Sequence, residues 1–289
     1  MSIDYLIGVD GGGTGTRVVV ADRDGRELKR AQGGPSGLGL GIEPAWQAVQ
    51  ATAASAFAEL GVSYSPVHCA IGLGLAGVHN AGWAQAFLRA APGYAHIALD
   101  TDGFTTLLGA HGGQPGAIVA VGTGTIGEVW FGGDDKRTAS GWGFPSGDEG
   151  SGAWIGLRAA QLAQKALDGR APRGPLAEAV IAHWGGSVDA AFSWLGAATQ
   201  TTYAQLTPLV IQTAASDPAA DTILAQAGVE VAAIADALDP NHSLPLALCG
   251  GLAEALAAWL PPALLNRARP SQGDSATGAL HLIRGRLHG

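Results

Sequence analysis

Two glycine-rich stretches of this 289-residue chain have the composition of backbone cradles for phosphate. The first, Gly11–Gly15, holds four glycines in five residues, directly after an apolar run that ends at Asp10. A turn between strands needs so many glycines where its backbone closely approaches a ligand or adopts positive φ. Exposed backbone amides can then donate to phosphate oxygens, and threonine hydroxyls add donors. An ordinary flexible hairpin turn is the alternative interpretation.

A second stretch, Gly122–Thr125, repeats this pattern in the other half of the chain. Two such turns in matching places can hold one polyphosphate from two sides, which favours the phosphate interpretation of both. Neither stretch is followed by the lysine of a P-loop, and neither opens a helix as a dinucleotide-binding motif does. The pattern therefore disfavours a Rossmann fold.

Three aspartates stand at the ends of predicted strands, where carboxylates can take part in phosphoryl transfer. A carboxylate beside phosphates needs a cation between them, so we expect Asp10 to serve Mg²⁺; a turn-capping role is the alternative. Asp100 and Asp102 flank the start of a predicted helix, and we expect one of them to cap it. The other can accept the proton of a substrate hydroxyl as general base, and we select Asp102 for that role.

The segment Ser140–Gly156 gathers glycines, Trp142, a proline and the acids Asp148 and Glu149 ahead of a predicted helix. Carboxylates accept hydrogen bonds from hydroxyl or ammonium groups, so the segment suits a polyhydroxylated or cationic ligand. The alternative is a capped helix start, with Ser146 or Asp148 as the cap.

A last glycine pair, Gly250 and Gly251, follows a predicted strand in the sequence CGGLAE and precedes a predicted helix. A flat nucleobase can lie against backbone that has no side chains. A plain strand-to-helix turn explains the pair equally well.

The composition of the chain excludes several classes of partner. Its formal net charge of -8 leaves no basic face to displace phosphate counterions, which excludes a nucleic-acid binder. Cys69 and Cys249 are far apart and form no CxxC motif, so we expect neither a disulfide framework nor a cysteine-ligated metal. No export signal precedes the first strand, and no apolar stretch reaches about 18 residues. We therefore expect a cytoplasmic protein that does not enter a membrane.

The order of predicted elements gives two related halves. The first half begins with strands at Tyr5–Val9, Thr16–Ala21 and Arg26–Ala31, followed by a helix from Pro44 to Leu60, and reads β-β-β-α-β-α-β-α. A similar series starts after Gly113. It has strands at 117–121 and 126–131, a helical block at 152–238, a strand at 244–249, a helix after Gly251 and a last helix from about Ser275.

Two halves that each start with a strand, a Gly/Thr turn and a strand predict two lobes facing one another across a cleft. We place the N-terminal lobe at residues 1–111 and the C-terminal lobe at 112–275, with the helical insert at 152–238. The terminal helix, about 276–289, is expected to pack back on the first lobe.

Taken together, these segments resemble the sugar kinase and actin-like ATPase superfamily, and within it the BadF/BadG/BcrA/BcrD-type group that includes N-acetylglucosamine kinases. The resemblance covers nearly the whole chain and rests on IGVDGGGTGTR, GLGLAG, LDTDGFTTLLGAH, IVAVGTGTIGEV, FPSGDEGSGAWIGLR, LALCGGLAE and DSATGAL, in that order. It implies an α/β fold of two actin-like, ribonuclease H-like lobes, each a mixed β-β-β-α-β-α-β-α sheet with helices, and with ATP and a sugar in the cleft between them.

The resemblance also implies roles for individual residues. Asp10 would serve the metal and the phosphates, and Asp102 matches the catalytic base of the family. The implied ATP-binding residues are Gly12, Gly13, Thr14, Gly122, Thr123, Gly124, Gly250 and Gly251. The implied sugar-binding residues are Ser36, Gly37, Asp102, Trp142, Asp148 and Glu149.

One departure from the family pattern bears on the sugar. Relatives tend to have an asparagine in the loop after the third strand, where its amide can bind the sugar, but this chain has Gly37 there. Either Ser36 substitutes for it or the sugar preference differs. The zinc motif CxCGxxGC of a neighbouring kinase group is missing, as is the cysteine cluster of the iron-sulfur dehydratase activators.

The function that follows from this resemblance is ATP-dependent phosphorylation of the 6-hydroxyl of an amino sugar, with ATP and Mg²⁺ as cofactors. A free ammonium at carbon 2 suits the acids Asp148 and Glu149, so glucosamine is favoured over N-acetylglucosamine, which is the first alternative. The second alternative is a binding protein of the same fold that senses ATP or sugar without transferring phosphate. The oligomeric state stays open, and the insert at 152–238 is a candidate surface for a homodimer.

Overall fold

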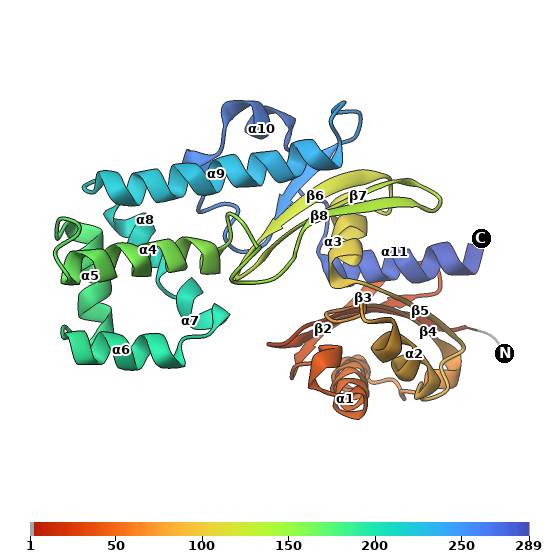
Figure 1. Cartoon of the computed structure of the whole chain (residues 1–289). Helices are drawn as coiled ribbons and strands as arrows, with labels where there is room; N and C mark the ends of the chain where they lie inside the picture. Colours follow the sequence, from red (N-terminus) through yellow and green to blue (C-terminus); the bar gives the residue numbers. More distant parts are fainter. Residues whose placement is uncertain (1–2, 289) are drawn as a thin grey trace. The chain divides into compact units, whose positions relative to one another are not determined.

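A computed structural model describes residues 3–288 of the chain, which divide into two compact units. The first unit comprises the segment up to Gly116, Trp130–Asp134 and the segment from Pro270 onward. The second comprises Ala117–Val129 and Asp135–Arg269. Each unit contains one sheet with helices around it (Figure 1), which confirms the predicted α/β class.

The first unit contains a five-stranded sheet in the order β3-β2-β1-β4-β5. Strands β1, β2 and β3 are antiparallel neighbours, while β4 and β5 run parallel to β1. Its elements are β1 (Tyr5–Gly11), β2 (Thr16–Asp22), β3 (Glu27–Gly33), α1 (Ile42–Leu60), β4 (Cys69–Leu75), α2 (Ala81–Arg89), β5 (His96–Asp100), α3 (Asp102–Ala110) and α11 (Ser275–His288). This is the β-β-β-α-β-α-β-α order predicted from the sequence, with the terminal helix added.

Local sequence explains where these elements begin and end. The Asp-Gly turn between β2 and β3 forms as predicted, because Gly25 adopts φ 89° and the Asp22 carboxylate accepts from the amide of Arg26 at 2.9 Å. Helix α1 carries Pro44 in its first turn and ends at Gly61, which has the left-handed φ of 70°.

Helices cover both faces of this sheet (Figure 1). On one face, α1 and α2 bury a core that includes Val49, Phe57, Ile71 and Phe87. On the other face, α11 packs with Leu280 and Ile283 against Leu6, Val19 and Ala70.

Helix α11 approaches the sheet unusually closely, through two glycines on neighbouring strands. A Cβ built on Gly8 of β1 would lie 2.1 Å from the carbonyl oxygen of Ala276. A Cβ on Gly72 of β4 would lie 1.9 Å from the carbonyl oxygen of Ala279. Only glycine permits this approach, and the contact fixes the height of α11 above the strands that lead to the candidate site.

The second unit combines a four-stranded sheet, in the order β8-β7-β6-β9, with a bundle of helices. Its strands are β6 (Gly116–Val121), β7 (Thr125–Gly132), β8 (Asp135–Ser140) and β9 (Leu246–Cys249), and β9 runs parallel to β6. Its helices are α4 (Gly152–Leu167), α5 (Pro175–Trp184), α6 (Val188–Ala197), α7 (Gln200–Ala204), α8 (Thr207–Thr213), α9 (Pro218–Leu238) and α10 (Pro262–Arg267).

Two features of this unit differ from the sequence prediction. The resemblance implied a third strand in this lobe, but β8 was not located in the sequence, because DKRTAS is polar and mostly exposed and so shows no apolar alternation. The α-helix predicted directly after Gly251 is wrong: the segment forms turns and a short 3₁₀ helix, Ala257–Trp259. The carbonyl of Trp259 packs where a Cβ on Gly228 of α9 would stand, 2.1 Å away, and Pro261 and Pro262 follow at once.

Across residues 3–288, no helix combines the length and the apolar character needed to cross a bilayer.

Candidate active site

The first glycine loop joins β1 to β2 and leaves its own backbone bare. None of its glycines adopts positive φ, so close approach is the reason left for their number. At Gly11 the packing of the protein itself requires glycine, because a Cβ there would lie 2.1 Å from Ser36 Oγ. Gly12 and Gly13 face open space, since a Cβ on either would meet nothing within 4 Å. The loop therefore presents side-chain-free backbone outward, as a phosphate cradle requires.

A cavity of about 380 Å³ lies against this loop. Asp10, Arg17 and Gln32 contribute polar side chains to its wall, beside Gly12 and Thr14–Thr16 of the loop. The wall of the cavity therefore combines the bare backbone of the loop with one carboxylate and one guanidinium group.

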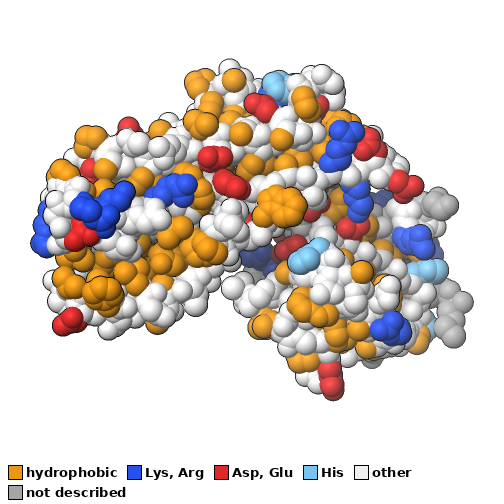
Figure 2. All heavy atoms as spheres, viewed as in Figure 1, with side chains coloured by type: hydrophobic (Ala, Val, Ile, Leu, Met, Phe, Trp, Pro, Cys, Tyr) orange, Lys and Arg blue, Asp and Glu red, His pale blue; other side chains and the backbone are white. Residues whose placement is uncertain are grey.

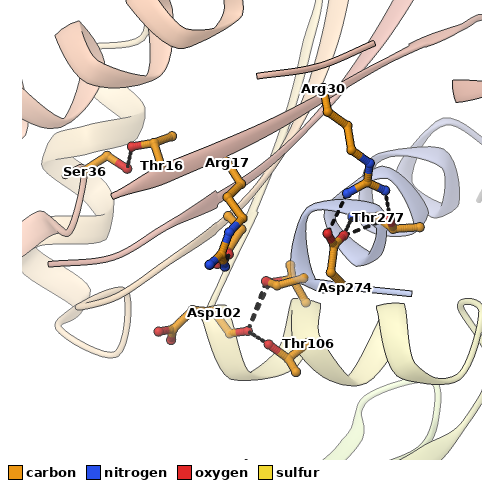
Figure 3. A network of polar contacts seen from close by, with 11 residues as sticks. Thr16, Arg17, Arg30, Ser36, Asp102, Thr106, Asp274 and Thr277 are labelled. Carbon is orange, nitrogen blue, oxygen red and sulfur yellow. Dashed lines mark hydrogen bonds and ion pairs between the residues drawn. The ribbon is translucent and has the colours of Figure 1, made fainter. Parts of the chain in front are cut away.

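Ser36 and Gly37 brace the loop from behind. Their amides both donate to the carbonyl oxygen of Gly12 at 3.0 Å. The Ser36 side chain is fully buried, and the Thr16 hydroxyl lies 2.7 Å from its oxygen (Figure 3). In this conformation the hydroxyl of Ser36 supports the loop and does not reach the surface.

Asp10 is held by groups from two other elements. In the β1–β2 ladder Asp10 lies directly opposite Arg17, and Arg17 Nη1 is 3.1 Å from Asp10 Oδ2. Ser275, at the start of α11, is near enough to Asp10 to lower the pKa of its carboxyl. Burial raises the pKa of Asp10, while Arg17 and then Ser275 oppose that rise, and the charge of nearby Asp102 adds to it.

Asp102 is an exposed residue in the first turn of α3 (Figure 3). Its Oδ1 accepts from the amide of Gly103 at 3.1 Å. Although the residue is exposed, the protein atoms around its carboxylate partly desolvate it and raise its pKa, against the opposing effects of the Gly103 amide and the nearby His79. Asp102 is therefore accessible to a ligand and more basic than an ordinary aspartate.

The expectation that one of the two acids caps α3 is wrong. The cap is Thr101, which lies between them and accepts from the amide of Phe104 at 3.0 Å. The Oδ1 atom of Asp100 instead accepts from the amide of Thr101 at 2.9 Å. Because a threonine hydroxyl satisfies the helix amide, the Asp102 carboxylate is free of the capping role.

In the second unit, the second glycine loop is joined to the start of α4. The amide of Gly122 donates to Gly124 O at 2.8 Å and closes the turn between β6 and β7. The amides of Gly152 and Ala153 donate to the carbonyl oxygens of Gly122 and Thr123, at 2.8 and 3.1 Å. The start of a long helix thereby fixes the loop.

The paired glycines after β9 lie beside this loop. Gly250 has φ 87°, and a Cβ there would lie 2.3 Å from Val121 O, so no other residue fits without a shift. The amide of Leu252 donates to the same carbonyl at 3.0 Å. The two loops share a cavity of about 570 Å³, whose wall is completed by α8. It is lined by Gly122, Thr123, Gly152, Ala204, Thr207, Pro208, Ile211, Gln212, Gly251, Leu252 and Ala255.

The predicted sugar loop is built around a buried acid. Asp148 is 6% exposed and adopts φ 59°, and its Oδ2 accepts from Gln200 Nε2 at 2.7 Å. Burial raises its pKa, opposed by the Gly143 amide and then by Gln200. Glu149 accepts from Ser140 Oγ at 2.8 Å. Trp142, by contrast, is 85% exposed.

The alternative cap for α4 is also corrected by the structure. Neither Ser146 nor Asp148 caps the helix; Ser151 does, by accepting from the amide of Trp154 at 3.1 Å. The Asp148 carboxylate instead accepts hydrogen bonds from the Gly143 amide and from Gln200.

Three residues at the candidate site were not singled out from the sequence. Arg17 is recognisable in hindsight, because a tight hairpin places it opposite Asp10. Ser275 and Gln200 come from distant segments and carry no local signal.

Magnesium fits the residues present around the first loop. Among residues 3–288, no group of three or more His, Cys, Asp or Glu residues could form a protein cage for a metal. Mg²⁺ does not need one, since it is commonly held by one or two carboxylates together with water and substrate phosphates. Asp10, beside a bare phosphate-type loop, meets that description.

Comparisons with known proteins agree with this architecture. A model of the BadF/BadG/BcrA/BcrD ATPase family matches residues 7–280. The chain is 33% identical over 282 residues to glucosamine kinase GspK of Vibrio cholerae serotype O1, covering 96% of this chain and 95% of the relative. It is 56% identical to a candidate N-acetylglucosamine kinase from Chromobacterium violaceum, with a TM-score of 0.93 over 98% of this chain and 100% of the other.

A more distant solved structure is similar in fold alone. It is a ROK family glucokinase from Streptomyces griseus, 19% identical, with a TM-score of 0.52 over 99% of this chain and 100% of the other. The predicted sugar kinase and actin-like fold is thereby confirmed.

Proposed function

Because this chain belongs to the BadF/BadG/BcrA/BcrD ATPase family, we propose that it is an ATP-dependent kinase that phosphorylates the 6-hydroxyl of glucosamine. The observation that carries the proposal is the first loop, where bare backbone at Gly12 and Gly13 adjoins the carboxylate of Asp10, which in turn lies near enough to Asp102 to feel its charge. A relative that matches nearly the full length of the chain is a glucosamine kinase.

We assign the phosphates of ATP to the two glycine loops. Gly12, Gly13 and Thr14 would donate from the first loop, and Gly122–Gly124 from the second. Phosphoryl transfer depends mainly on positioning and on neutralising charge, and rigid backbone donors supply both. Arg17 adds the cation that a lysine supplies in a P-loop.

We assign the nucleoside to the cavity of about 570 Å³ beside Gly250 and Gly251. Pro208, Ile211 and Leu252 give its wall the apolar surface that a flat base requires, and the glycine backbone leaves room for it.

Asp10 is the residue that would hold Mg²⁺. The ion, when bound with ATP, would neutralise the charge on the phosphate oxygens. Arg17 and Ser275 both favour the ionised carboxylate of Asp10, and that is the form that binds a cation.

Asp102 would accept the proton of the sugar hydroxyl as that oxygen attacks the γ-phosphorus. Its raised pKa makes it a better proton acceptor than an ordinary aspartate, and at neutral pH it remains a candidate base. Around the sugar we assign Trp142, Asp148 and Glu149, with Ser36 and Gly37 shaping the loop behind the phosphates.

One specific observation favours a second substrate. The relative with 56% identity over nearly the full chain is a candidate N-acetylglucosamine kinase. The two sugars differ at carbon 2, where glucosamine carries an ammonium group that acids such as Glu149 can bind.

We further place the reaction in the cytoplasm, because Cys69 and Cys249 are both free thiols, as is usual in a reducing compartment.

The experiment is ADP release from Mg-ATP in the presence of glucosamine, N-acetylglucosamine, glucose or N-acetylmuramic acid, each against a control without sugar. We expect the highest kcat/KM with glucosamine. A higher kcat/KM with N-acetylglucosamine would make that sugar the preferred substrate and would leave the kinase proposal standing. ATP binding without any sugar-dependent ADP would contradict the kinase proposal and indicate a sensor.

A further inference from the structure

A cavity of about 410 Å³ in the first unit is lined by basic and apolar residues that the proposed reaction does not use. It is lined by Ile3, Leu6, Arg23, His96, Arg284, Arg286 and Leu287. Three arginines and one histidine thus line the cavity, and no acid of residues 3–288 does.

This cavity lies at the end of the sheet opposite the first glycine loop. Leu6 lies at the start of β1, whose other end, Gly11, lies beside the loop. The ladder aligns Leu6 with Ala70 and Ala70 with His96. Arg23 directly follows β2, whose other end, Thr16, borders the loop. The cavity is therefore separate from the proposed phosphate cradle.

Helix α11 connects the same two ends. Its first residue, Ser275, lies at the end near Asp10, with its Oγ 3.4 Å from the carbonyl oxygen of Asp102, whereas Arg284 and Arg286 in its last turns line the cavity. The guanidinium of Arg284 packs over the hairpin turn, where a Cβ on Gly25 would lie 2.8 Å from Cζ. The turn thus fixes one of the cationic groups in place.

No acid of the described residues 3–288 forms an ion pair with the arginines of this cavity. Within residues 3–288, none of Arg23, His96, Arg284 and Arg286 forms an ion pair or a side-chain hydrogen bond with a described partner. On the same hairpin, Arg26 does form one, with its Nε 3.3 Å from Asp22 Oδ2.

Such a cluster is unusual for this molecule, because the chain as a whole carries a formal net charge of -8. Like charges held together repel one another unless an anion lies between them. Burial and the nearby charge of Arg284 also lower the pKa of His281, one turn earlier in α11.

We propose that this cavity binds a phosphorylated small molecule. The planar guanidinium groups match the oxygens of a phosphate group in pairs, and Arg is the residue best suited to that geometry. Ile3, Leu6 and Leu287 give the remaining wall an apolar surface for the organic part of the ligand. A sugar phosphate and a nucleotide share this chemistry.

The test is the rate of phenylglyoxal modification of each arginine in the intact protein, followed by peptide mass spectrometry. Glucosamine 6-phosphate, AMP and inorganic pyrophosphate are the three probes. We expect a probe to slow modification of Arg284 and Arg286 about fivefold or more, as charge-assisted binding shields both groups. Arg89, an exposed arginine outside this cavity, is the internal control and should react at an unchanged rate.

Calorimetric titration of the same probe supplies the second measurement. The double variant Arg284→Gln/Arg286→Gln should bind it about tenfold or more weakly, as expected when charged hydrogen bonds are lost. Arg26→Gln removes one positive charge from the nearby β2–β3 turn, outside the cavity lining, and should bind like the wild type.

Protection by the sugar phosphate alone, or by AMP alone, would support the proposal and identify the source of the phosphate group. Unchanged modification of Arg284 and Arg286 with all three probes would overturn it, as would equal protection of Arg89. Modification rates do not depend on turnover, so this result stands apart from the kinase assay.

Discussion

Replacing Asp102 by asparagine separates proton transfer from binding at the candidate site. Asparagine keeps an oxygen that can accept from the Gly103 amide, now at 3.1 Å from Oδ1, but it cannot take a proton from a hydroxyl. A positioned general base contributes about 10²–10⁴-fold to a rate, and each tenfold corresponds to about 1.4 kcal/mol of activation free energy. We expect kcat to fall by at least about 10²-fold in Asp102→Asn.

The same change should leave the folded state nearly as stable. Asp102 lies in the first turn of α3, where losing a negative charge costs about 0.3–1 kcal/mol of helix stability. Burial of the carboxylate and the nearby charge of Asp10 act in the other direction, so the net change should stay within about 1 kcal/mol.

The assay is ADP release at saturating ATP and sugar, together with ATP affinity from calorimetry. Affinity for ATP should be kept, because a negative charge near the phosphates has been removed. Asp100→Asn is the matched control: it also lies at this strand end, accepts from the Thr101 amide at 2.9 Å and should turn over normally. If Asp102→Asn keeps kcat within about threefold of the wild type, Asp102 is not the base.

Three further predictions test other parts of the structure. A base must be ionised to act, and desolvation raises the pKa of Asp102. As the pH is lowered, kcat/KM should therefore begin to fall at a pH above the ordinary aspartate pKa of 3.8. The residual activity of Asp102→Asn should not show this fall in its pH profile. Gly72→Ala should lower the free energy of unfolding by about 1–3 kcal/mol, since its Cβ would lie 1.9 Å from a carbonyl oxygen of α11. Gly285→Ala, whose Cβ would meet nothing within 4 Å, should instead raise the free energy of unfolding by up to about 1 kcal/mol. Urea melts compare the two variants, and equal effects would contradict the close-packing argument. Ala255→Trp should fill the cavity assigned to the nucleoside and raise KM for ATP about tenfold or more, with KM for the sugar unchanged; an unaltered KM for ATP would place the nucleoside elsewhere.

Much of the first unit could be predicted because its signals are local. The valines of β2, the Asp-Gly turn after it and the glycine that ends α1 each act on residues next to them in the chain. The same holds for the glycine loops, whose composition alone indicated a close backbone approach. Strand β8 was missed because an exposed edge strand needs no apolar face.

Capping shows where local signals become ambiguous. Asp100, Thr101 and Asp102 are all good caps by type, and the sequence gives no reason to select the threonine. The structure selects Thr101, so the Asp102 carboxylate does not cap the helix and makes one hydrogen bond to the Gly103 amide.

The sequence by itself determined every strand except β8, most of the helices, the two glycine loops and the acids beside them, because each depends on residues that are close along the chain. Only the tertiary structure brought Ser275 to Asp10 and Gln200 to Asp148, and gathered Arg23, Arg284 and Arg286 around one cavity. Contacts between distant segments are set by how helices pack on sheets, as at Gly8 and Gly72, where the missing side chains let α11 settle against the strands. Periodicity along the chain records which face of an element is buried, but it does not record which partner buries it.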